Sequence, residues 1–161
     1  GRGSHPAGAA AGSPRRGGIG AEVEAAAPGE WNAFPGVVHG RPELCISVRS
    51  DDDSWASVAG FLAERLRGSC PFSSGNTIRF GRPVAPESSL TSFVVFAPSV
   101  LDRADLRIDV SPDGHAGHDT IHLTGLYPIH EDELRYITEH GLEAFWHLDW
   151  DMYDTSRQSV V

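Results

Sequence analysis

One stretch of the chain has the apolar periodicity of an amphipathic helix. Over residues 55–67 the apolar side chains recur at three- and four-residue steps and share one side. Asp53 or Ser54 can cap the start of such a helix, and Gly68 can end it. The pattern therefore predicts a helix over 55–67 with one buried face.

Several other segments have the residue types or the period-two alternation of β-strands. The predicted strands are 43–49, a short strand around Ile78 and Phe80, 92–97, 106–110 and 121–123. In the last two, apolar and polar positions alternate, which predicts half-buried strands joined by a hairpin-like loop over 111–119.

Helical periodicity returns near the carboxyl end. Leu134 and Ile137 share a face behind an acidic first turn, and Gly141 can end that helix. Apolar spacing over 142–150 predicts a second, short helix. The remaining residues, 151–161, read as a polar tail.

The composition divides the chain into two parts. Residues 1–30 are dominated by Gly, Ala, Pro and Arg without apolar periodicity, which predicts a flexible leader. Bulky residues begin at Trp31, so the folded domain is expected over 31–161. The total of 161 residues suits one domain of ordinary size.

Charge and cysteine content narrow the class of partner. The chain has 13 Lys and Arg against 22 Asp and Glu, a formal net charge of −9 that repels nucleic acid and suits a basic protein partner. Cys45 and Cys70 alone make neither a disulfide framework nor a zinc site. Without an apolar run of ~18 residues or a secretion signal, a cytoplasmic protein with no membrane contact is expected.

Ordered blocks between residues 31 and 148 are similar to those of a known family. They are 42–46 with Trp55, 70–72, 75–78, 80–83, 89–98, 123–134 and 140–144. Together these blocks resemble the suppressor-of-fused domain family, particularly its bacterial members. The block 123–134, which would be a closing strand, turn and helix, is the most specific part of the resemblance.

The resemblance implies an α+β fold in which helices flank a mixed, mainly antiparallel sheet. Members of the family include an animal regulator that binds zinc-finger transcription factors of Hedgehog signalling, and bacterial relatives proposed as immunity proteins. A protein-binding module that neutralises or regulates a partner protein is therefore implied, with no cofactor. The chain departs from the family in its Gly- and Ala-rich start and its short amino-terminal half.

Residues near the carboxyl end are the expected contacts with such a partner. An acidic turn before the last helices suits a basic surface, although acidic first turns also suit the helix dipole. An aromatic and acidic edge follows, where rings can either bind or pack in a core. The expected contact residues are Tyr127, His130, Glu131, Asp132, Glu133, Asp149 and Trp150.

A cluster of histidines supports an alternative, a scaffold recruited as a small-molecule tailoring enzyme in a bacterial biosynthetic pathway. His115, His118 and His122 are weak metal-ligand candidates, because they converge only if their loop folds back, and a solvated hairpin loop is the simpler explanation. The catalytic candidates of this alternative are His122, His130, Glu133 and Tyr127. Neither a Gly-x-Ser-x-Gly elbow nor a phosphate-binding glycine loop after a strand is present.

Overall fold

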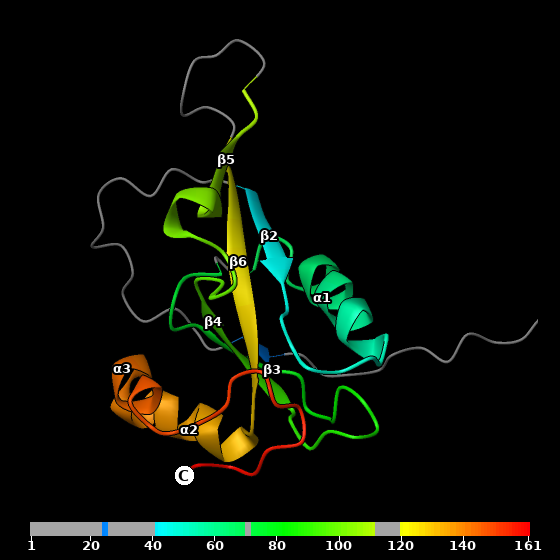
Figure 1. Cartoon of the computed structure of the whole chain (residues 1–161), viewed down its shortest axis with the longest axis vertical. Helices are drawn as coiled ribbons and strands as arrows, with labels where there is room; N and C mark the ends of the chain where they lie inside the picture. Colours follow the sequence, from blue (N-terminus) through cyan, green and yellow to red (C-terminus); the bar gives the residue numbers. More distant parts are fainter. Residues whose placement is uncertain (1–23, 26–40, 70–71, 112–119) are drawn as a thin grey trace, which may run out of the picture.

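The computed structural model describes residues 24–25, 41–69, 72–111 and 120–161 (Figure 1). The elements are β1 (Glu24–Ala25), β2 (Arg41–Cys45), α1 (Ser54–Arg65), β3 (Thr77–Arg79), β4 (Ser92–Phe96), the 3-10 helix η1 (Arg103–Leu106), β5 (Arg107–Asp109), β6 (Thr120–Ile129), α2 (Glu131–His140) and α3 (Leu142–Trp146). The described residues thus form an α+β fold, as the sequence resemblance implied.

One mixed sheet carries the fold. Its strand order is β1-β3-β4-β6-β2, with β5 pairing to β6 off this path. The β2–β6 pair is parallel and the other pairs are antiparallel. The ten residues of β6 allow it to pair with β5 and β2 in its first half and with β4 in its second half. The central strand therefore links both ends of the sheet.

The two faces of the sheet bury separate cores, because side chains alternate along each strand. In the first core, on one face, Leu126 of β6 packs with Phe93 of β4 beneath α1. In the second core, on the other face, Tyr127 and Ile129 of β6 pack with α2 and α3. Each helix covers one face, and Figure 1 shows α1 on the opposite side of β6 from α2 and α3.

The predicted helices and most strands are confirmed with shifted ends. The helix predicted at 55–67 spans Ser54–Arg65, and its Trp55, Val58 and Leu62 are buried. Asp53 is its N-cap residue, as one of the two expected caps, but makes no side-chain capping bond; the Asp52 Oδ1 atom accepts the bond from the Ser54 N–H at 2.8 Å. Gly141, with a φ of 88°, ends α2 as expected.

Two strand predictions need correction. The strand predicted at 43–49 is β2, which ends at Cys45 opposite Gly125 of β6. The strand predicted to be half-buried over 106–110 contains β5, whose residues are all exposed, with Ile108 at 44%. Its exposure follows from its place at the end of the sheet away from α2 and α3 (Figure 1).

Two regions for which the sequence predicts no helix or strand contribute to the fold. Glu24–Ala25, inside the predicted leader, pair with Ile78 and Arg79 of β3, whereas the rest of 1–30 and the start of the domain up to residue 40 lie outside the described residues. The predicted polar tail contains two buried residues, Thr155 and Arg157. The tail is therefore part of the second core.

Candidate functional site

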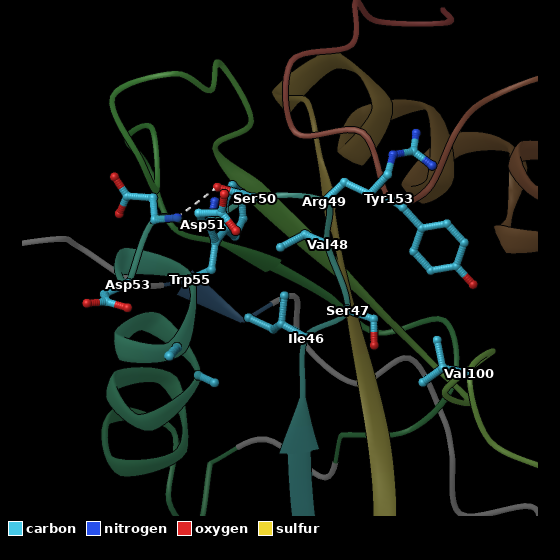
Figure 2. A pocket seen from close by; sticks show the side chains of 13 residues that line it. Ile46, Ser47, Val48, Arg49, Ser50, Asp51, Asp53, Trp55, Val100 and Tyr153 are labelled. Carbon is cyan, nitrogen blue, oxygen red and sulfur yellow. Dashed lines mark hydrogen bonds between the residues drawn. The ribbon is translucent and has the colours of Figure 1, made fainter.

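A hollow of about 610 Å³ lies where the chain passes from β2 to α1. It is lined by residues 46–53, by Trp55, Ala56 and Ala59 at the start of α1, and by Val100 and Tyr153 from two distant loops. Figure 2 shows these side chains around the extended segment that continues from β2. Three separate parts of the sequence thus form one candidate site.

The extended segment 46–49 borders both the hollow and the core beneath α1. Ile46 and Val48 point toward α1 and pack against that core (Figure 2). Ser47 and Arg49 point the opposite way, as expected for alternating side chains. The Arg49 N–H donates to the Tyr153 carbonyl at 2.9 Å. The carboxyl-terminal part of the chain therefore holds the end of the stretch 46–49 in place.

Glu87 connects the segment to α1. Its Oε1 atom accepts hydrogen bonds from the Ser50 hydroxyl at 2.7 Å and from the Trp55 indole N–H at 3.2 Å. The Ser50 bond is the main reason that the pKa of Glu87 lies below its usual value. Glu87 is therefore an anion at neutral pH that also fixes the Trp55 ring.

The acidic turn at the hollow contains carboxylates in two different situations. Asp52 is bonded to the first turn of α1, and its hydrogen bonds with Ser54 lower its pKa. Asp51 and Asp53 are exposed, and within the described parts of the chain neither carboxylate has an ion-pair partner. Their negative charges are therefore available to a bound group.

Arg49 is the cationic side chain that lines the hollow, and it is already paired. Its guanidinium donates to the carboxylate of Asp151, which raises the pKa of Arg49 and holds that of Asp151 below its usual value. The charged side chains in and around the hollow are Asp51, Asp52, Asp53, Glu87, Asp151 and Arg49. The hollow therefore has an excess of negative charge.

The sequence predicts partner contacts at the junction of β6 and α2, away from the hollow. For Glu133 this prediction is wrong, because its side chain is buried. Its side chain is 0% exposed and bonds Arg157 at 2.5 and 2.7 Å. It also accepts hydrogen bonds from the backbone N–H groups of His130 at 2.8 Å and Val160 at 3.2 Å. Glu133 holds the carboxyl-terminal segment instead of forming part of the surface.

The other acidic residues of this turn are also engaged. Glu131 forms an ion pair with Arg79 of β3 at 2.6 Å and accepts a hydrogen bond from the Ser92 hydroxyl at 3.3 Å. Asp132 accepts a hydrogen bond from the Glu133 N–H at 3.1 Å. Two of the three carboxylates are thus paired with arginines of the same chain.

The aromatic candidates lie in the second core. The Tyr127 hydroxyl donates to the Ala97 carbonyl and accepts from the Ser99 N–H, both at 2.8 Å, and burial raises its pKa. Trp150 packs against Tyr127 and Phe145, and the Arg157 guanidinium lies over its ring. Asp149 beside it is exposed. These rings support the fold, whereas Asp149 is exposed to solvent.

The catalytic candidates do not form one cluster. His122 lies on the face of β6 opposite Tyr127, because five positions separate them and side chains alternate. The His130 Nε2 atom is 3.0 Å from the Arg157 carbonyl, and Glu133 is in the buried ion pair. Only His130 and Glu133 are brought together, and both hold the tail.

Of the three metal-ligand candidates, the structure describes His122. His115 and His118 lie outside the described residues. The buried Nε2 atom of His122 has no hydrogen-bond partner in the described part of the chain. No group of three or more His, Cys, Asp or Glu that could hold a metal occurs among the described residues. The loop-based metal site thus stays a prediction.

The predictions about the cysteines and about membrane-spanning segments can be compared with the described residues alone. Cys45 is a free, half-buried thiol whose pKa is raised by burial, and Cys70 lies outside the described parts. Among the described helices none is both long and apolar enough to cross a bilayer.

Comparison with solved structures bears on the fold. The chain is similar to the crystal structure of a protein from Neisseria gonorrhoeae FA 1090 that carries the provisional description of a SUFU (suppressor of fused protein) homolog. The TM-score is 0.60 at 21% sequence identity, over 78% of this chain and 65% of the other. The chain has a SUFU-like fold. It spans about two thirds of that protein's length, and neither the protein-family models nor the curated proteins searched gave a match.

The hollow was not predicted as a site. Three consecutive aspartates between a strand and a helix were the available signal, but such a run also serves as a helix start. Nothing local to Val100 or Tyr153 indicates that they meet this turn. Only the folded chain brings the carboxylates next to an aromatic ring and apolar side chains.

Proposed function

We propose that this chain is a protein-binding module that docks a basic segment of a partner protein in the hollow between β2 and α1. The observation that carries the proposal is that Asp51 and Asp53, which have no ion-pair partner in the part of the chain that the structure describes, line a hollow together with Tyr153 and Val100. The SUFU-like fold agrees with the family resemblance in the sequence, and that resemblance implies a module that neutralises or regulates a partner protein.

The charge of the hollow favours a cation. The start of α1 carries the positive end of a helix dipole, equivalent to about half a charge, which alone would repel a basic group. Three aspartates at that point outweigh it. The net charge of −9 over the whole chain adds a long-range attraction for a basic partner.

The shape of the hollow favours an arginine or lysine side chain over a small cation. The aliphatic stem of such a residue can pack on the apolar side chains that line the hollow, while its charged head reaches the aspartates. Tyr153 offers the face of a ring for a cation–π contact. A free metal ion would use the carboxylates but not these apolar groups.

The test is titration of the ¹⁵N-labelled protein with an Arg-rich peptide, followed by NMR, with an acidic peptide of equal length for comparison. The expected result is that the Arg-rich peptide shifts the amides of 46–59 and the Trp55 indole N–H, which lies beside Glu87. Affinity should fall as salt is raised, because exposed charges are screened.

Matched variants separate the hollow from the overall charge. Asp51→Asn with Asp53→Asn should weaken binding about tenfold, whereas Asp102→Asn with Asp105→Asn, which removes the same charge from exposed positions near η1, should change it little. Equal losses in both pairs would show that only the net charge attracts the peptide. Shifts confined to another surface would refute the proposed site.

A further inference from the structure

Strand β5 forms an edge with unusual exposure. All three of its residues are exposed, and it pairs on one side with β6. Within the described chain the exposed large hydrophobic residues are Val100, Leu101, Ile108, Val110 and Val161, so four of the five lie between residues 100 and 110. An exposed apolar edge strand is a template for pairing with another strand.

The residues of this edge are complementary to themselves. In an antiparallel pair of two β5 strands centred on Ile108, each Arg107 lies opposite Asp109 of the second copy. Ile108 lies opposite its own copy, and Val110 extends the apolar face. The order of basic, apolar and acidic residues thus places an opposite charge at both ends of the pairing.

Both charged side chains are available for this contact. Arg107 has no ion-pair partner in the described part of the structure. The Oδ1 atom of Asp109 accepts a hydrogen bond from the Ser111 N–H at 2.9 Å. The bonds with Ser111 lower the pKa of Asp109, so its carboxylate is charged at neutral pH. Its other oxygen can therefore accept from a guanidinium.

We propose that two copies of this chain associate through β5, antiparallel about a two-fold axis at Ile108, and so join two sheets into one. The charge order favours a second copy over an unrelated strand, because the self-pairing satisfies Arg107 and Asp109 of both copies. No residue of β5 lines the hollow at α1, so the dimer can be tested independently of the proposed function.

The first experiment is sedimentation of the full chain over a concentration range, with charge-reversal variants. The contact is small, so the wild type is expected to be monomeric at low concentration and dimeric toward about millimolar, as weak interfaces are. Arg107→Asp alone or Asp109→Arg alone places like charges opposite each other and should raise the dissociation constant about tenfold or more.

The double variant Arg107→Asp with Asp109→Arg decides the register. It restores opposite charges in the self-pairing, so dimerisation should return to near the wild-type level. Arg103→Asp, an equal charge change on the neighbouring η1, is the control and should leave the dimer unchanged. A wild type that stays monomeric at all concentrations, or a double variant as weak as the singles, would overturn the proposal.

Crosslinking gives a second readout that is independent of charge. With Cys45 and Cys70 changed to Ser, an Ile108→Cys variant should form a covalent dimer on oxidation, because directly opposed residues of antiparallel strands bring their Cα atoms to about 4.5–5.5 Å. Val100→Cys, also exposed, is the matched control. Equal crosslinking at both positions would indicate random collision and contradict the two-fold pairing.

Discussion

Two arginine–carboxylate pairs attach the carboxyl-terminal segment to the body of the molecule, in opposite environments. Arg157 and Glu133 have side-chain exposures of 6% and 0%, whereas Arg49 and Asp151 have 62% and 47%. The first pair also accepts backbone hydrogen bonds and stacks on Trp150. The second pair lies in water at the edge of the hollow. The same chemistry thus serves the interior in one place and the surface in the other.

The difference lies in what remains when one partner is removed. A lone charge in the interior has lost its solvation and its partner, whereas a lone charge at the surface regains water. The buried pair is therefore expected to control folding, and the exposed pair to adjust local geometry and charge.

Arg157→Ala should destabilise the protein by about 3–5 kcal/mol, because it leaves the Glu133 carboxylate buried without a counter-charge. Urea unfolding followed by far-UV circular dichroism measures the change. Arg67→Ala, which removes the exposed partner of Glu64, is the matched control and should have little effect. Equal midpoints for the two variants would contradict the assignment of Arg157 to the core.

A double-mutant cycle sharpens the same point. Glu133→Leu and Arg157→Met should each be costly alone, but the double variant should cost less than their sum by about 1–3 kcal/mol, since neither charge is then stranded. Some loss should persist, because the N–H groups of His130 and Val160 lose their acceptor. Additive free energies of unfolding would show that the two side chains act separately.

Tyr127→Phe tests burial without charge. The variant leaves the Ala97 carbonyl and the Ser99 N–H without their hydroxyl partner, and a neutral buried hydrogen bond contributes about 1 kcal/mol. The loss should be smaller than for Arg157→Ala in the same unfolding measurement. Phe96→Leu, at a position in the same core that retains these hydrogen bonds, separates the loss of the hydroxyl from a change in packing. If Tyr127→Phe lowered the free energy of unfolding as much as Arg157→Ala, the size of the loss would depend on burial and not on charge.

Arg49→Ala should have the smallest effect on unfolding at neutral pH. Because the pKa of Asp151 is lower in the folded state than in the unfolded state, its contribution is present above the unfolded pKa and is lost as pH falls through the folded pKa. The small difference between wild type and Arg49→Ala should therefore vanish in acid, below the usual range of an aspartate. A difference that grows on acidification would give the opposite sign and contradict the pairing.

Local pattern was sufficient for most elements. The periodic apolar residues of α1 and α2 and the β-branched run of β4 gave elements that differ from the prediction by one or two residues. The end of β2 could not be read in the same way, because residues 46–49 have strand-like composition but lie beyond the pairing with β6. Likewise, the alternation around β5 matches a half-buried strand, and only the position of the helices exposes it.

By itself the sequence determined the main helices and strands and the acidic charge of the chain, and its resemblance to a known family implied the fold class. The elements and the charge follow from short-range spacing and composition, which are present in any local window. Only the tertiary structure decided that Glu133 meets Arg157, 24 residues away, and that Asp51 and Asp53 have no arginine partner among the described residues. Which carboxylate is neutralised depends on which distant segment packs beside it, and burial then determines whether that charge stabilises the interior or remains available to a partner.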